Sequence, residues 1–262
     1  MSETIQVNFH CHSIFSDGDQ TPDALAANLA SSGVRFAALT DHDSLEGFSR
    51  FQEVLKKRGV ASVPGVELTT HFNGREVHIL GYGFDPLNPD LSATLLSLRQ
   101  VRELEVQSIA GSLRKIGTNH QDRVNPSSLE NSAPNGQLGV IEAIALIHRG
   151  GGIAFLAHPF MYEVDLDKLD TFVAELKSGG LDGIEALYAP YTEAQRAQLR
   201  QLAQKYSLLI CAGTDFHGSN SSISNQYTLE IPREDWINFR EALFSSNTFD
   251  LAEQTDFDGI NI

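Results

Sequence analysis

The chain of 262 residues is acidic, with 41% hydrophobic and 20% charged residues and a formal net charge of −15. Such a balance argues against a general nucleic-acid surface, which needs clustered lysine and arginine, so no stable nucleic-acid complex is expected. No apolar run approaches the roughly 18 residues that a membrane-spanning helix needs, and the first residues form no signal peptide. The two cysteines provide no disulfide framework. We therefore expect a cytoplasmic protein without membrane contacts, built as one domain over residues 1–262.

The first third of the chain alternates between strand and helix patterns. Thr21 and Pro22 are typical of a helix N-cap and first turn, and Gly33 ends that helix. Asn73-Gly74 between two alternating segments is a strong hairpin signal. The predicted strands here are 5–9, 36–40, 60–66, 68–72 and 76–80, and the predicted helices are 21–32 and 44–58.

The rest of the chain continues this alternation after one long helical pattern. The predicted helices are about 92–116, 139–149, 167–178, 192–206 and 233–244, and the predicted strands are 153–157, 183–186 and 208–212. Residues 125–136 are polar and contain proline and glycine, which predicts an exposed loop. Repeated strand-then-helix units predict an α/β fold with a parallel sheet.

Side chains that can bind metals follow the predicted strands at one end. His10 and His12 are two apart on a strand, so their imidazoles point to the same face, and Asp215 and His217 repeat this spacing late in the chain. In α/β folds, the carboxyl ends of the strands carry the functional site. We therefore predict a metal site closed by the first and last strands. The residues in this register are His10, His12, Asp41, His42, Asp43, Glu67, His158, Asp215 and His217, with His78 in the hairpin beside Glu67.

Six motifs, in this order, resemble the PHP family, named for its occurrence in polymerases and histidinol phosphatases. They are Phe9-His10-Cys11-His12-Ser13 with Ser16-Asp17-Gly18, Leu39-Thr40-Asp41-His42-Asp43, Pro64-Gly65-Val66-Glu67, His78-Ile79-Leu80-Gly81-Tyr82, Ala157-His158-Pro159 and Gly213-Thr214-Asp215-Phe216-His217. Each motif is weak alone, but their shared order makes the resemblance specific over nearly the whole chain. The resemblance implies a distorted (β/α)7 barrel whose metal site lies at the C-terminal end of the strands.

The resemblance also implies metal ligands and catalytic residues. The expected ligands are His10, His12, Glu67 and Asp215 for a first ion, Asp17, His42 and His217 for a second, and the bridging Glu67 with His78 and His158 for a third. The expected catalytic residues are His10, His12, Asp17, His42, Glu67, Asp215 and His217. Imidazole and carboxylate ligands suit two or three divalent ions of Mn, Fe or Zn.

The implied reaction is hydrolysis of a small phosphate monoester, with a nucleoside mono- or 3′,5′-bisphosphate as the expected substrate. A metal-bridging hydroxide attacks phosphorus, because divalent ions lower the pKa of bound water to roughly 7. Asp41 and Asp43 flank His42 and are expected to orient it or hold a proton. For Asp43, a helix N-cap is an equal alternative. Glu185, at the same end, either lines the site or has a structural role.

Specificity is expected to reside in residues 90–138. The subgroup most similar to this chain, nucleoside 3′,5′-bisphosphate phosphatases and related 5′ exoribonucleases, carries a larger helical cap here, so we expect a reduced cap insertion and a more open site. Arg99 and Arg102 are three apart and can share a helix face, where either contacts phosphate or stays a solvated surface residue. Ser219, in a Ser/Asn-rich loop, is a further candidate phosphate contact, although a flexible loop is the simpler explanation.

Three other functions stay open at this point. A histidinol-phosphate phosphatase would share the metals and recognise an amino alcohol instead of a nucleotide. A C–N hydrolase is compatible with a binuclear barrel. A non-catalytic metal-binding module fits least, because every ligand position of the family pattern carries a suitable residue.

Overall fold

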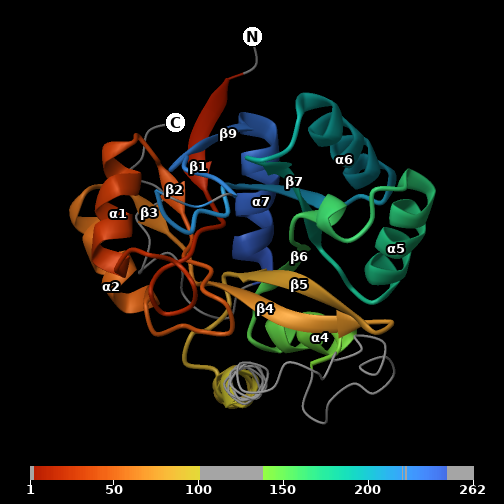
Figure 1. The fold of residues 1–262 in the computed structure, drawn as a ribbon, viewed down its shortest axis with the longest axis horizontal. Coiled ribbons are helices and arrows are strands. Elements are labelled where there is room, and N and C mark those ends of the chain that lie inside the picture. Colours follow the sequence, from red (N-terminus) through yellow and green to blue (C-terminus); the bar gives the residue numbers. More distant parts are fainter. Residues whose placement is uncertain (1–2, 101–137, 220, 222, 247–262) are drawn as a thin grey trace, which may run out of the picture.

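The computed structural model describes residues 3–100, 138–219, 221 and 223–246. Within these ranges the protein has a mixed α/β fold with two sheets (Figure 1). The four-stranded sheet has the order β3-β2-β1-β9, and the five-stranded sheet has the order β4-β5-β6-β7-β8. The strands are β1 Thr4–Asn8, β2 Phe36–Ala37, β3 Ala61–Ser62, β4 Gly65–Phe72, β5 Arg75–Tyr82, β6 Ile153–Leu156, β7 Gly183–Tyr188, β8 Leu209–Gly213 and β9 Leu229–Pro232.

The parallel sheet predicted from the sequence is correct for two groups of strands, the predicted hairpin is confirmed, and the antiparallel β5–β6 and β1–β9 pairs were not expected. Strands β1, β2 and β3 are parallel, as are β6, β7 and β8. The β4–β5, β5–β6 and β1–β9 pairs are antiparallel. The predicted two-residue turn at Asn73-Gly74, where both residues have positive φ, forces β4 and β5 into a hairpin. The hydrogen-bonded strands of the two sheets do not form one closed barrel.

Most helices flank these sheets on the outside, whereas α7 (Arg233–Ser246) lies centrally in Figure 1 and contacts strands of both sheets. In Figure 1, α1 and α2 pack together beside β1–β3, and α5 and α6 flank β6–β8. Their bounds are α1 Pro22–Ser31, α2 Phe48–Lys57, α4 Val140–Arg149, α5 Leu166–Ser178, α6 Glu193–Lys205 and α7 Arg233–Ser246. Residues 89–100 are also helical. The rest of the helix predicted to residue 116, and the loop predicted over 125–136, lie outside the described residues.

Helix α2 begins four residues later than predicted, at Phe48 with Gly47 as N-cap. Asp43 therefore does not cap it. The Asp43 carboxylate instead accepts a hydrogen bond from the Thr69 backbone N–H at 2.8 Å, which ties the segment after β2 to β4.

An aromatic cluster anchors the strand that leads into the first histidine motif. Phe9 packs against Phe239 and Trp236 of α7, with ring centroids 4.7 and 5.8 Å apart. Cys11 points away from the neighbouring histidines into a buried apolar cluster, as its alternation with them predicts, and donates its S–H to the Ala38 carbonyl. The packing of Phe9 and Cys11 therefore holds the backbone around His10 and His12 in place.

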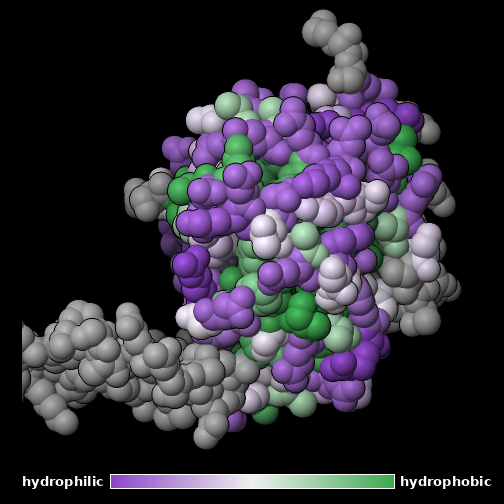
Figure 2. All heavy atoms as spheres, turned by 90° about the vertical axis from the view of Figure 1, so that its right-hand side faces the viewer, coloured by the Kyte–Doolittle hydropathy of each residue, from purple (hydrophilic) through white to green (hydrophobic). Residues whose placement is uncertain are grey.

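The surface is mostly hydrophilic on the face that carries α5 and α6, with smaller apolar areas between the polar side chains (Figure 2). Across the described residues, no helix combines the length and the apolar character that a bilayer crossing requires.

Candidate metal centre

The two motif segments from opposite ends of the chain lie side by side, as predicted. Asn8, the last residue of β1, links them through its side chain. Its Oδ1 accepts from the backbone N–H groups of His10 and Thr214 at 3.1 and 3.2 Å, and its Nδ2 donates to the Thr214 hydroxyl. The Asp215 N–H also donates to the His10 carbonyl at 2.8 Å. This linking role of Asn8 has no signal in the sequence motifs.

Four buried side chains converge in the first group of candidate ligands. The Nε2 atoms of His10 and His12 lie 3.1 and 3.2 Å from Glu67 Oε2. The same nitrogens lie 3.2 and 3.1 Å from Asp215 Oδ1. One donor atom from each residue falls within 4.8 Å of all the others, a spacing that suits a shared cation.

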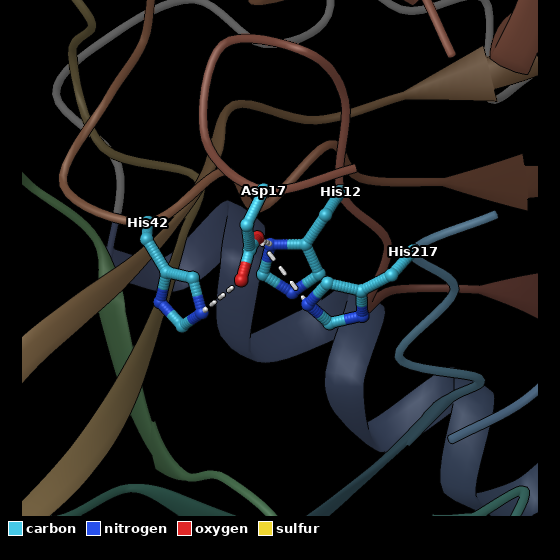
Figure 3. Close-up of side chains that lie close together, drawn as sticks. All are labelled: His12, Asp17, His42 and His217. Carbon is cyan, nitrogen blue, oxygen red and sulfur yellow. Dashed lines mark ion pairs between the residues drawn. The ribbon is translucent and has the colours of Figure 1, made fainter. Parts of the chain in front are cut away.

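Asp17 joins a second group at the solvent side of the first. Its carboxylate points between the rings of His42 and His217, at 3.7 and 3.3 Å from their Nε2 atoms (Figure 3). His12 completes this group through Nδ1, which lies 3.5 Å from Asp17 Oδ1. The Asp17 side chain is 52% exposed, whereas that of Glu67 is 1% exposed. The cluster therefore has a buried wall and an open rim.

A third group consists of His42, Glu67 and His78. His78 Nδ1 lies 2.9 Å from Glu67 Oε1, and His42 Nδ1 lies 3.3 Å from Glu67 Oε2. His158 approaches Glu67 Oε1 to 3.1 Å through Nε2. The three groups share members, because His12, His42 and Glu67 each belong to two of them.

The donor set fits divalent ions. The buried Nε2 atom of His12 and Nδ1 atom of His42 lie 3.1–3.3 Å from carboxylate oxygens but lack the geometry of a hydrogen bond. Buried polar atoms of this kind are costly unless another group satisfies them. The ion pairs of Asp17, Glu67 and Asp215 within the described ranges run to histidines and include no lysine or arginine. A cation between these atoms would satisfy both the nitrogens and the carboxylates.

Most pKa shifts in the cluster point to the same demand for positive charge, whereas burial lowers the pKa of His42 to about 3. Burial disfavours protonated imidazoles, yet Asp215 and Glu67 outweigh it and raise the pKa of His12 to about 9. Glu67 and Glu76 likewise raise the pKa of His78 to about 10. Burial also opposes ionisation of Glu67 and Asp215, but neighbouring imidazoles hold the pKa of each carboxyl well below its usual range.

A family model described as PHP domain matches residues 8–233. The chain belongs to the PHP domain family. It is 30% identical over 248 residues to the 5′-3′ exoribonuclease of Haemophilus influenzae, and this match covers 82% of this chain and 90% of the relative. It is 26% identical over 247 residues to the 3′,5′-nucleoside bisphosphate phosphatase of Chromobacterium violaceum, covering 80% of this chain and 87% of the relative.

A solved structure shares the fold of this PHP domain. It is a Chromobacterium violaceum protein described as an amidohydrolase with bound SO4 and no metal, and it superimposes with a TM-score of 0.75 at 22% identity. The match covers 90% of this chain and 96% of that one.

The carboxylates predicted to support the PHP ligands act on the backbone and on serines. Asp41 accepts from the Ser13 N–H and hydroxyl at 2.6 and 2.8 Å and from the Ser16 hydroxyl at 2.9 Å. It therefore fixes the loop that carries Asp17, and its carboxylate contacts Ser13 and Ser16 instead of His42, which we expected it to orient. Asp43 holds β4 through the Thr69 contact described above.

Glu185 and Tyr188 on β7 also touch the cluster. The Glu185 carboxylate is fully buried and lies 2.9 Å from His10 Nδ1, so both features of its open role are found together: it is a buried carboxylate, and it contacts a candidate ligand. Tyr188, absent from the motifs, donates its hydroxyl to Asp215 Oδ2 at 2.8 Å. Sequence periodicity gave no reason to single out this tyrosine.

The predicted phosphate contacts lie at the edge of the described residues or beyond it. The Arg99 guanidinium forms an exposed ion pair with Glu46. Arg102 lies outside the described residues. Ser219 is exposed just past His217.

Proposed function

We propose that this PHP domain is a metal-dependent phosphoesterase that hydrolyses small phosphate monoesters, with nucleotides as the foremost substrates. The observation that carries the proposal is the sharing of His12, His42 and Glu67 between adjacent ligand groups. Ions held in groups that share ligands are near neighbours. Neighbouring divalent ions are the arrangement that phosphatases and nucleases use for in-line displacement at phosphorus.

The residues that would hold the ions are those expected from the motifs: His10, His12, Asp17, His42, Glu67, His78, His158, Asp215 and His217. Two or three divalent ions of the Mn, Fe or Zn type suit this donor set. Bound ions would supply Lewis-acid polarisation of the ester and a lowered pKa for water.

The protein's own side chains would arrange the substrate around this centre. The Glu67 and Asp215 side chains form the buried wall, so the ester approaches from the side of the half-exposed Asp17. His42 and His217 flank that opening, so a phosphoryl oxygen that enters there would come next to the ions that these side chains hold. Because Asp41 fixes the loop that carries Asp17, the rim keeps its geometry while the ester is held.

The names of the relatives support a nucleotide as substrate. One acts on nucleoside 3′,5′-bisphosphates and another on RNA from its 5′ end, so both process nucleotide phosphate esters. We further propose one domain over residues 1–262 with a reduced cap insertion over about 90–138, working in the cytoplasm.

We also infer a fold of the distorted (β/α)7 barrel type. Contacts between the sheets at the site end support it: the Phe9 N–H donates to the Ala212 carbonyl, and isolated parallel bridges join Cys11 to Phe216 and His42 to Glu67. The segments that follow β1 and β2 thus approach the five-stranded sheet and the segment after it beside the cluster.

A hydrolysis screen with Mn-loaded protein tests the function, in which released phosphate, mononucleotide or amine is measured according to the bond that each compound offers. The panel contains a nucleoside 3′,5′-bisphosphate, a 5′-monophosphate, histidinol phosphate, a 5′-phosphorylated oligoribonucleotide and an amide. We expect the nucleoside phosphates to be hydrolysed fastest, with loss of activity in Asp215→Asn. Preference for histidinol phosphate or for the amide would replace the proposal with one of the alternative enzymes. No turnover of any compound would favour the non-catalytic module.

A further inference from the structure

Strand β7 supplies none of the expected metal ligands, yet two of its side chains reach the cluster. Glu185 and Tyr188 are three residues apart, a spacing that places side chains on opposite faces of a regular strand. Between them the pairing with β8 is irregular, because Ile184 pairs with Ile210 whereas Leu187 pairs with Ala212. The extra residue on β7 is a β-bulge, and bulges re-aim side chains next to active sites. Both Glu185 and Tyr188 are consequently buried and turned toward the cluster.

Glu185 contacts two candidate ligands at once. Its Oε1 lies 2.9 Å from His10 Nδ1, and its Oε2 accepts the backbone N–H of His158 at 2.9 Å. When His10 Nδ1 donates to this carboxylate, its Nε2 keeps a free lone pair aimed at Glu67 and Asp215. His158 has the strained φ of 27°, a conformation that persists only where its surroundings enforce it. The bond from Glu185 is one such constraint.

Tyr188 acts on the opposite side of the same group. Its hydroxyl donates to Asp215 Oδ2 at 2.8 Å, which leaves Oδ1 to face His10 and His12. Asp215 also has an unusual φ of 51°. The bulged strand β7 therefore restrains both His10, near the start of the chain, and Asp215, about two hundred residues later.

We propose that Glu185 and Tyr188 are positioning residues, which hold His10, His158 and Asp215 in the geometry that binds metal. This inference rests on the proposed metal-dependent function. A carboxylate satisfies both donors that face Glu185, but a glutamine has one acceptor oxygen and turns its amide N–H toward a donor. Loss of such an outer partner typically lowers metal affinity about 10- to 100-fold.

The chain offers a control for Glu185. Asp182, just before β7, also contacts one imidazole and one backbone N–H: its Oδ2 lies 2.7 Å from His148 Nε2 and 2.8 Å from the Ala154 nitrogen. His148 is not among the candidate ligands. Asp182→Asn therefore controls for the loss of a carboxylate charge beside an imidazole and a backbone N–H away from the cluster, although Asp182 makes both contacts through one oxygen and is 29% exposed.

The test is a calorimetric titration of Mn²⁺ into metal-free full-length protein, with urea unfolding of each variant as a second readout. We expect Glu185→Gln to bind Mn²⁺ about 10- to 100-fold more weakly, Tyr188→Phe to bind it more weakly by a smaller factor, and Asp182→Asn to keep wild-type affinity. Tyr206→Phe, which loses a hydroxyl bonded to Asp170 on the surface, controls for Tyr188→Phe. If Glu185→Gln does not fold, the Mn²⁺ affinity of Tyr188→Phe is compared with that of Tyr206→Phe, and this comparison tests the positioning role.

Wild-type affinity in both Glu185→Gln and Tyr188→Phe would overturn the inference. Equal losses of affinity in Glu185→Gln and Asp182→Asn would also overturn it, because they would indicate general destabilisation. In both cases the proposed function survives if the wild type still binds Mn²⁺ and releases phosphate. A wild type that takes up no Mn²⁺ would contradict the proposed function and, with it, the positioning role.

Discussion

Gly213 lies where β8 passes closest to His10, and Gly213→Ala is the most direct steric perturbation of the cluster. A Cβ at this position would lie 2.2 Å from His10 Cβ and 2.5 Å from Glu185 Oε1. Carbon atoms in contact prefer about 3.5–4.0 Å, so His10 and β8 would have to separate by roughly 1 Å or more. The Phe9–Ala212 and Asp215–His10 backbone hydrogen bonds hold the two segments together on either side, so the separation strains both.

We expect Gly213→Ala to lower the free energy of unfolding by about 1–3 kcal/mol, the usual cost of overpacking. For a chain of this size, that corresponds to a fall in Tm of roughly 2–12 °C. The variant should also bind Mn²⁺ more weakly, because the added methyl intrudes on the His10–Glu185 contact. Gly139→Ala is the control: its added Cβ meets nothing within 4 Å, so only the loss of a favoured N-cap residue of α4, less than about 1 kcal/mol, and an unchanged Mn²⁺ affinity are expected. Urea unfolding and Mn²⁺ titration measure both effects. Wild-type stability and affinity in Gly213→Ala would refute the reasoning.

Three further predictions concern the surroundings of the cluster. The metal-free protein should lose stability in urea as pH rises from about 6.5 toward 10, because the pKa values of His12 and His78 are raised to about 9 and 10 in the folded state. An imidazole with a raised pKa contributes its full stabilisation only below its pKa in the unfolded chain, and that contribution is lost as pH rises through the folded-state pKa. A stability that rises over this range would contradict the prediction. Asp41→Asn, which keeps one acceptor oxygen for three donors, should cost about 1–3 kcal/mol in urea unfolding, and an unchanged midpoint would count against it. Arg99→Ala should cost less than about 1 kcal/mol, because its ion pair with Glu46 is exposed, and should leave KM for a bisphosphate unchanged; a tenfold rise in KM would identify Arg99 as a phosphate contact.

Part of the cluster was predictable from the alternation of residues along a strand and from one turn signal, whereas Asp17 was expected only from the resemblance to the PHP family. Residues two apart on a strand share a face, so the His10/His12 and Asp215/His217 pairs were visible in the sequence, and the turn residues Asn73-Gly74 indicated the hairpin that carries His78. The same rules failed where the chain departs from regular geometry. The bulge in β7 leaves no mark in the alternation of residues, so Tyr188 was missed and the role of Glu185 stayed open.

Contacts between residues far apart in the sequence also decide where helices and strands begin and end, and a local sequence pattern does not reveal such contacts. Asp43 resembles a helix N-cap in the sequence, but its carboxylate is engaged by the Thr69 N–H, and α2 starts only at Phe48. The short strand β9 pairs with β1 across more than two hundred residues, and nothing local distinguishes it from a loop. In each case a tertiary contact outweighs the local preference.

Phosphate release during a titration of Mn²⁺ into metal-free protein tests the central claim most directly. With a nucleoside 3′,5′-bisphosphate as substrate, activity should be absent before the titration and should rise to a plateau at two or three ions per chain. Asp215→Asn, which alters a carboxylate shared by His10 and His12, should shift the titration to much higher Mn²⁺ and lower the plateau. Full activity without divalent metal, or an identical titration for Asp215→Asn, would contradict the account.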